Sequence, residues 1–129
     1  MPANIYIIED HPLMQKMIKQ FLSRLTSLTI CGTAGSAQEA LAQIPGDIDI
    51  ALVDVSLPDM NGIMLVSELK ALYPQLYCLM LSGHQESTYA QRALAAGASG
   101  YVTKGNPIEL ANAIEQVLAG DVYLSEGVR

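Results

Sequence analysis

Residues 50–54 read Ile-Ala-Leu-Val-Asp, an unbroken apolar run that ends in a carboxylate. A continuous apolar run, unlike an alternating one, is typical of a strand buried on both faces of a parallel sheet. Asp54 therefore stands at the carboxyl end of a predicted central strand. Ligands of open α/β sheets bind outside that end of the strands. This stretch predicts both the fold class and the place of a functional site.

Other predicted strands along the chain end in polar side chains in the same way. The side chains that follow these strands are, in chain order, the acidic pair Glu9 and Asp10, then Ser82, then Lys104. Because the carboxyl ends of parallel strands meet at one edge of a sheet, we expect these groups to share a pocket with Asp54. Three carboxylates, a hydroxyl and an ammonium group can together hold a divalent cation beside a phosphoryl group.

Strand-like and helix-like patterns alternate along the whole chain. The predicted strands are residues 4–8, 28–32, 48–53, 77–81 and 100–103, and the best-bounded predicted helices are residues 63–73 and 85–96. Strands separated by helices pair in parallel through right-handed crossovers. The sequence thus predicts an α/β fold, a five-stranded parallel doubly wound sheet with helices on both faces.

Helix start signals support these assignments. Ser36 and Glu39 have the spacing of a capping box, in which each side chain bonds a backbone N–H of the first turn. Asn106 precedes Pro107 and starts the last helix, with an acid in its first turn. Asp10 is also placed to cap the first helix.

Composition limits the classes of function. The chain has 129 residues, half of them apolar, and a formal charge of −6. Its seven basic residues form no run, so this domain lacks the basic surface that nucleic-acid binding requires. The longest uncharged stretch, residues 71–85, is too short to span a membrane, and no targeting segment is evident. We expect one cytoplasmic domain over residues 1–120, with residues 121–129 starting a linker to an absent output domain.

The two cysteines, Cys31 and Cys78, fall on separate predicted strands and have neither metal-site nor CxxC spacing. We expect both to be buried free thiols in a reducing compartment.

The acidic cluster has a definite chemical requirement. Carboxylates a few ångströms apart repel one another, and a proton or a cation must relieve the repulsion. Mg²⁺ prefers hard oxygen ligands and sites with one or two carboxylates plus a phosphate. Asp10 and Asp54 could each supply an oxygen, Glu9 could bind directly or through water, and the backbone carbonyl of Ser56 could add another ligand.

Asp54 could then attack phosphorus and form an acyl phosphate. Lys104 would pair with a phosphoryl oxygen, and Ser82 would donate its hydroxyl to another. Each residue alone has a plainer interpretation: a strand-ending aspartate often caps a helix, and a lone lysine is often solvated. His11 and His84 have no ligand spacing and receive no role. The joint occurrence of these groups at strand ends favours the phosphoryl site.

Together these residues resemble the receiver domain of two-component response regulators, which has a CheY-like, flavodoxin-like (βα)5 fold with strand order 2-1-3-4-5. The resemblance covers about residues 4–119. Its motifs here are Ile-Ile-Glu9-Asp10-His-Pro, Leu-Val-Asp54-Val-Ser-Leu-Pro58-Asp-Met-Asn-Gly62, Met-Leu-Ser82-Gly and Ala-Ala-Gly97-Ala-Ser-Gly-Tyr101-Val-Thr-Lys104.

The resemblance implies a bacterial signalling domain rather than a conventional enzyme. Asp54 would accept a phosphoryl group from a sensor histidine kinase, with Mg²⁺ held by Glu9, Asp10 and Asp54. Ser82 and Tyr101 would form the switch, with Tyr101 turning from solvent into the interior, while Lys104 would grip the phosphoryl group. The alanine-rich fourth helix is expected to move readily. Homodimer formation on phosphorylation is compatible with this resemblance.

The end of the chain resembles regulators that carry a LuxR-type helix-turn-helix domain, so DNA binding and transcription regulation would belong to a longer parent protein. One position departs from the receiver pattern: Gly105 stands where many receivers have a cis-proline.

Three alternatives stay open at this stage. A flavodoxin-like FMN protein would need a Ser/Thr- and Gly-rich phosphate loop where Glu9 and Asp10 stand. An aspartyl phosphatase would usually carry an acid at the position of Ser56. The third alternative is a receiver-like interaction module that is never phosphorylated.

Overall fold

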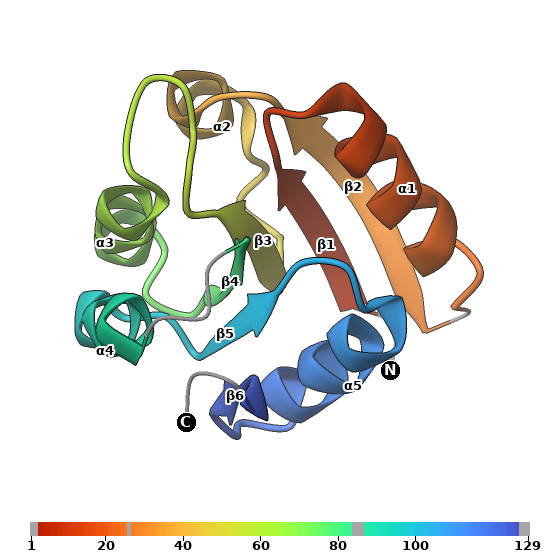
Figure 1. Ribbon diagram of the computed structural model, residues 1–129. Helices are drawn as coiled ribbons and strands as arrows, with labels where there is room; N and C mark the ends of the chain where they lie inside the picture. The colour runs from red at the N-terminus through yellow and green to blue at the C-terminus, as the bar shows by residue number, and fades with distance from the viewer. Residues whose placement is uncertain (1–2, 26, 84–86, 127–129) are drawn as a thin grey trace.

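The computed structural model describes residues 3–25, 27–83 and 87–126, which form a parallel sheet covered by helices (Figure 1). The strands are β1 (Ala3–Ile8), β2 (Leu28–Ala34), β3 (Ile50–Asp54), β4 (Tyr77–Ser82), β5 (Gly100–Thr103) and β6 (Tyr123–Leu124). The helices are α1 (Pro12–Leu22), α2 (Ala37–Gln43), α3 (Gly62–Leu72), α4 (Ser87–Ala96) and α5 (Pro107–Leu118).

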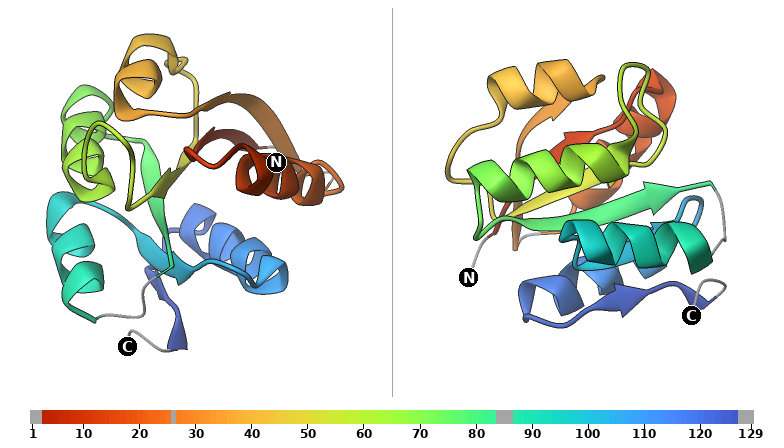
Figure 2. Two further views of the ribbon diagram at one scale, coloured as in Figure 1. Left: turned by 45° about the horizontal axis from the view of Figure 1, so that its top comes forward. Right: turned by 90° about the vertical axis from the view of Figure 1, so that its left-hand side faces the viewer.

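The strand order is β2-β1-β3-β4-β5-β6, and every pair is parallel. Helices α1 and α5 cover one face of the sheet, and α2, α3 and α4 cover the other (Figures 1 and 2). This confirms the predicted doubly wound α/β fold and its order 2-1-3-4-5. The sequence did not predict β6, which lies in the segment expected to start a linker.

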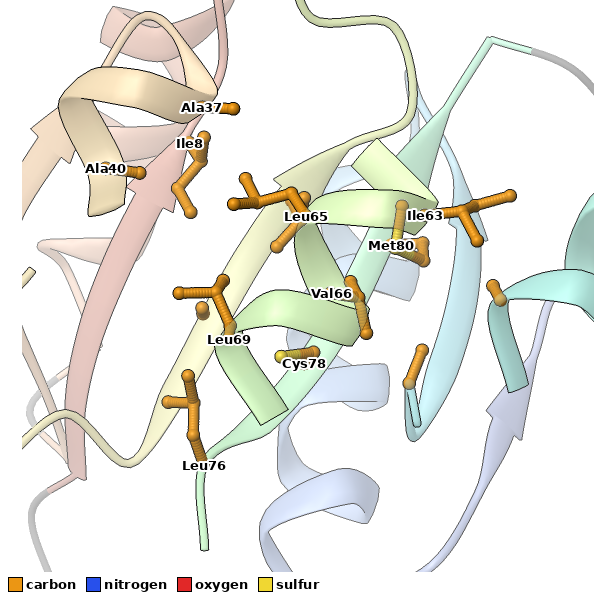
Figure 3. Close-up of a cluster of buried hydrophobic side chains, with 14 of the residues drawn as sticks. Ile8, Ala37, Ala40, Ile63, Leu65, Val66, Leu69, Leu76, Cys78 and Met80 are labelled. Carbon is orange, nitrogen blue, oxygen red and sulfur yellow. The ribbon is translucent and has the colours of Figure 1, made fainter. Parts of the chain in front are cut away.

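Alternation along the strands divides the interior into two cores. On β1, Ile5 and Ile7 belong to the core under α1 and α5, whereas Tyr6 and Ile8 belong to the core under α2, α3 and α4. Figure 3 shows this second core, in which Leu65, Val66 and Leu69 of α3 lie over the sheet. Side chains buried on both faces explain why these strands read as continuous apolar runs.

Helix α2 begins with the predicted cap. The Ser36 hydroxyl accepts a hydrogen bond from the Glu39 N–H at 3.1 Å. The Glu39 carboxylate, however, accepts from the Gly35 N–H at 2.8 Å instead of the Ser36 N–H. At α5 the Asn106 side chain accepts from the Glu109 N–H at 3.1 Å, as the sequence predicts.

The prediction that Asp10 caps α1 is wrong. The residue at the N-cap position is His11, and its side chain makes no capping hydrogen bond. Asp10 lies one residue too early and pairs with the His11 ring instead, at 3.2 Å.

Some predicted boundaries shift. Asp54 and Ser82 are the last residues of β3 and β4 rather than the residues after them. The predicted start of the fourth helix at Gln85 lies outside the described residues. Within the described ranges, none of the helices combines the length and apolar character that crossing a membrane requires.

Both cysteines are free, but only Cys78 is buried. Burial raises the pKa of the Cys78 thiol to about 12, which makes it unreactive. The prediction that Cys31 is buried is wrong, because β2 is an edge strand whose exposed positions include Cys31.

Candidate functional site

The carboxyl edge of the sheet gathers the polar groups named from the sequence. Asp54 ends β3, and Glu9 follows β1, whose last residue pairs with Val53 next to Asp54. Ser82 ends β4 and pairs with Thr103, the residue before Lys104. The parallel register of four neighbouring strands therefore places these groups at one edge.

Lys104 joins the acids directly. Its ammonium Nζ lies 2.8 Å from Glu9 Oε1 and 3.1 Å from Asp54 Oδ2. The Lys104 N–H also donates to the Ser82 carbonyl at 2.7 Å, which fixes the start of the loop after β5 against the end of β4. Glu9, Asp54 and Ser82 are almost completely buried, at 0%, 2% and 1% exposed.

His11 is a site residue that the sequence analysis set aside. Its ring Nδ1 lies 3.2 Å from Asp10 Oδ1 and 3.3 Å from Glu9 Oε2, and its backbone N–H donates to Glu9 Oε2 at 3.1 Å. Gln15 supports the same turn, since its side-chain amide donates to the Glu9 carbonyl at 3.0 Å. The available signal was adjacency: His11 directly follows the acidic pair.

The two buried carboxylates have opposite pKa shifts. Burial, followed by the hydrogen bond with Glu9, raises the pKa of Asp54 to about 7. Burial also acts to raise the pKa of Glu9, but hydrogen bonds with Asp54 and Lys104 outweigh it and lower that pKa to about 2. Burial opposes the charged form of Lys104, yet its two acidic partners raise its pKa. The site thus favours one proton on Asp54 beside an ionised Glu9.

The acidic cluster has the donor set for a hard cation. Glu9, Asp10, His11 and Asp54 each offer one ligand atom, and these atoms all lie within 4.8 Å of one another. Glu9 Oε1, Asp10 Oδ1 and Asp54 Oδ2 are buried oxygens that lie against the Lys104 ammonium or the His11 ring. Buried oxygens of this kind fit Mg²⁺.

The loop after Asp54 forms a tight turn that brings Gly62 back to the end of β3. The Ser56 N–H donates to Asp54 Oδ1 at 3.0 Å, and Ser56 forms an isolated antiparallel bridge with Asn61. The Gly62 N–H then donates to the Val55 carbonyl at 2.7 Å. A Cβ at Gly62 would collide with the Asp54 carbonyl oxygen, so only glycine allows this approach. The Ser56 carbonyl remains a predicted cation ligand.

The segment around β5 differs from the expectation for an unmodified receiver. Tyr101 is 0% exposed and packs in the core that includes Ala90 and Ala93 of α4. This is the inward position that the resemblance to receiver domains implies for the phosphorylated form. Gly105, at the place of the missing proline, has φ +105°, a region that side-chain-bearing residues rarely adopt, and no peptide bond of the described residues is cis.

An apolar groove of about 180 Å³ opens beside Lys104, between α1 and the loop that precedes α5. Met14, Met17, Phe21 and Pro107 contribute to its walls. Of these, Met17 is a large apolar side chain left 55% exposed. A partner that reached the acidic cluster from this side would meet apolar surface.

Comparisons with known proteins agree with this geometry. The family model described as the response regulator receiver domain matches residues 5–115. The chain is 38% identical over 120 residues to the DNA-binding transcriptional activator DevR/DosR of Mycobacterium tuberculosis, covering 92% of this chain and 55% of that protein. It is 33% identical over 131 residues to the nitrate/nitrite response regulator protein NarL of Escherichia coli, covering 98% and 60%.

Among solved structures, a two-component response regulator of the LuxR family from Aurantimonas sp. superposes with a TM-score of 0.89. It is 31% identical, with 99% of this chain and 93% of that chain covered. By contrast, the chain spans little more than half the length of the two curated relatives.

Proposed function

This chain belongs to the response regulator receiver domain family, and from that premise we propose that Asp54 accepts a phosphoryl group from a phosphohistidine of a sensor histidine kinase. One observation carries the proposal. Asp54 is a buried carboxylate whose Oδ2 lies 3.1 Å from the Lys104 ammonium, inside a cluster of acids that can hold a cation. Few structural roles require such a costly arrangement of buried charges.

In the transfer, an Asp54 carboxylate oxygen attacks phosphorus and forms an acyl phosphate. The phosphorus–nitrogen bond of the donor breaks, and its electron pair stays with the leaving imidazole, which takes up a proton. Asp54 must be ionised to attack, so loss of the proton that its raised pKa retains is part of the reaction. Lys104 is the cation already in contact with Asp54 and is placed to pair with a phosphoryl oxygen.

Glu9, Asp10 and Asp54 would hold Mg²⁺, with the Ser56 carbonyl as a further ligand. When bound, the ion neutralises charge on the transferring phosphoryl oxygens. The same carboxylates repel one another, so their oxygens gain most from a divalent cation.

The switch would run through Ser82 and Tyr101. Ser82 lies on β4 next to β3, and its carbonyl accepts the Lys104 N–H. A phosphoryl group on Asp54 adds charge and strong acceptors near these residues. We expect it to favour the arrangement in which Tyr101 is buried under α4, as a shift between two packings. Helix α4 anchors this core with small side chains, including Ala90 and Ala93, which supports the expectation that it moves readily.

The output would be transcription regulation by a longer protein. The two curated relatives have names that describe a DNA-binding activator and a response regulator, and both are longer than this chain. This domain carries a formal charge of −6, so DNA contact would belong to a LuxR-type domain that follows it. Dimer formation on phosphorylation is part of the same proposal. The apolar groove beside Lys104 supports an approach of the kinase from the α1 side.

Incubation with acetyl phosphate and Mg²⁺, followed by mass spectrometry, tests the proposal. We expect one added phosphoryl group in the wild type, its loss in Asp54→Asn and its retention in Asp59→Asn. Modification of Asp59 instead of Asp54 would overturn the assignment. Turnover of a generic phosphomonoester would favour the phosphatase alternative, and a bound yellow flavin would favour the FMN alternative.

A further inference from the structure

The C-terminal segment, residues 121–126, is attached to the strand that leads to Lys104. Its strand β6 pairs in parallel with β5, with Tyr101 opposite Leu124. The Tyr123 N–H donates to the Ser99 carbonyl and the Ser125 N–H donates to the Tyr101 carbonyl, both at 3.0 Å. The segment therefore follows the length of β5 rather than leaving the domain after α5.

A side-chain network holds the same segment. The Ser125 hydroxyl donates to Glu109 Oε1 at 2.9 Å and accepts from the Thr103 N–H at 3.0 Å. The Tyr123 hydroxyl donates to Glu109 Oε2 at 3.0 Å. Ser125 is only 2% exposed, so its hydrogen bonds form away from water. Both oxygens of one carboxylate on α5 thus hold the segment, and a satisfied network of this kind rigidifies what it joins.

The sequence of β5 leaves space for this contact. A Cβ at Gly100 would lie 2.8 Å from the Tyr123 carbonyl oxygen and 2.6 Å from a Leu79 methyl group. Any side chain at Gly100 would therefore push the segment away from β5. Close approach of a second backbone is one of the reasons for glycine inside a strand.

Ser125 connects this network to the phosphoryl site. It bonds the carbonyl of Tyr101 and the amide of Thr103, so it spans the end of β5 directly before Lys104. Lys104 in turn donates its N–H to the Ser82 carbonyl at 2.7 Å and contacts Asp54. A displacement of Ser125 therefore changes the support of β5 on the side opposite β4.

We propose that Ser125 is a positioning residue for Lys104, and that docking of residues 121–126 is thermodynamically coupled to occupation of the phosphoryl site. The inference rests on the proposed function and adds a partner to it, namely the chain's own continuation. The docked segment coexists here with a buried Tyr101, which is the position expected of the occupied site. Docking and occupation therefore favour each other, and coupling of this kind is reciprocal.

Hydrogen exchange on the 129-residue chain tests one direction of the coupling. Beryllofluoride with Mg²⁺ serves as the phosphoryl surrogate. We expect exchange of the Tyr123 and Ser125 amides to slow at least threefold when the surrogate is bound. Unchanged or faster exchange at both amides would overturn the inference, and this measurement needs no variant.

The reverse direction is tested with Ser125→Ala and Glu109→Gln. Each removes part of the network, and we expect the apparent affinity for beryllofluoride to weaken about threefold to tenfold, the effect of roughly one net hydrogen bond. Ser67→Ala and Glu115→Gln change the same chemical groups at exposed positions and should leave the affinity unchanged. Fluorescence or NMR titration gives the affinities, and thermal melting checks folding.

A purely structural network would lower the melting temperature of these variants without changing their affinity, and that result would overturn the inference. Normal beryllofluoride binding with unchanged hydrogen exchange at the Tyr123 and Ser125 amides would also overturn the inference. That result would leave the proposed function intact. Failure of the wild type to bind beryllofluoride would overturn the proposed function and the inference together.

Discussion

Asp54 ends β3 and Asp59 lies in the connection from β3 to α3, yet the two carboxylates have opposite environments. Asp54 is buried beside Glu9, and its pKa is raised to about 7. Asp59 is exposed and accepts hydrogen bonds from the N–H groups of Ala37 and Gln38 at 2.9 and 2.8 Å, which lower its pKa. Burial thus penalises the charge of Asp54, whereas two backbone N–H groups at the start of α2 stabilise the charge of Asp59.

The two aspartates show that the environment of a carboxylate, not its residue type, sets its pKa. Hydrogen bonds from two backbone N–H groups stabilise the charge of Asp59, whereas burial beside a second carboxylate penalises the charge of Asp54. Asp59 also completes the first turn of α2: it binds the Ala37 and Gln38 N–H groups while Ser36 binds the Glu39 N–H. The connection from β3 to α3 thus links Asp54, in a cluster whose buried oxygens fit a cation, to Asp59, whose oxygens accept two backbone hydrogen bonds.

The largest expected effect comes from Gly62, the first residue of α3, which packs against the backbone of Asp54. In Gly62→Ala the new Cβ would collide with the Asp54 carbonyl oxygen. We expect a loss of about 3 kcal/mol in the free energy of unfolding, because a backbone contact cannot yield as a side chain can. Urea denaturation measures it. Gly46→Ala is the control, since no heavy atom lies near its Cβ, and an equal loss in both variants would contradict the argument.

Replacing the buried Asp54 carboxylate should stabilise the protein in Mg²⁺-free buffer. The folded-state pKa of Asp54 is raised from 3.8 to about 7, so its contribution to stability is fully present below pH 3.8 and is lost as pH rises through about 7. We expect Asp54→Asn to raise the free energy of unfolding by about 2 kcal/mol at pH 8, with the gain vanishing toward pH 4. Urea denaturation with EDTA across this pH range provides the test.

Asp59→Asn should have the opposite sign. The pKa of Asp59 is lowered in the folded state, so its stabilising contribution is present above its ordinary pKa of 3.8 and is lost as pH falls through the folded value. We expect a lower melting temperature at pH 7 and a smaller difference at acid pH. If Asp54→Asn and Asp59→Asn changed the free energy of unfolding in the same direction at pH 8, the two carboxylates would not have opposite environments.

Binding of Mg²⁺ should distinguish Asp54 from Asp59, because only Asp54 lies in the acidic cluster. At ten times its dissociation constant, Mg²⁺ should stabilise the wild type by about 1.4 kcal/mol at pH 8. The gain should shrink at pH 6, where Asp54 retains a proton, and should be reduced in Asp54→Asn but not in Asp59→Asn. Thermal melting against Mg²⁺ concentration measures it, and equal stabilisation of all three proteins would count against a site at Asp54.

The smallest effect concerns the cap that Asp59 shares with Ser36. Ser36→Ala removes one capping hydrogen bond of α2 and should cost about 1 kcal/mol. Because both side chains satisfy the same first turn, the double variant with Asp59→Asn should depart from additivity. Strict additivity in a double-mutant cycle by urea denaturation would show that the two caps act independently.

Local patterns predicted the strands and the place of the site, whereas the sheet order followed from the resemblance to receiver domains. Apolar runs buried on both faces mark the strands, and parallel pairing then brings Glu9, Asp54 and Lys104 to one edge. The Ser36 and Asn106 caps are also local, since each bonds an amide within its own first turn.

What the sequence could not predict depends on contacts between distant segments. Asp59 bonds the first turn of α2, and β6 lies against Gly100 with the Tyr123 hydroxyl bonded to Glu109. The exposure of Cys31 follows from which strand lies at the edge, which composition does not reveal. The burial of Tyr101 depends on its packing in the core that includes Ala90 and Ala93 of α4, which its place in a strand does not reveal.

The two outer strands of the sheet leave it with unequal edges. At one side the two residues of β6 cover part of β5. At the other side lies β2, which has seven residues, and all of them except Cys31 pair with β1. An uncovered strand is a template for intermolecular pairing. Self-association at high concentration should therefore begin at β2, where the exposed Cys31 would allow an oxidant to lock two copies together.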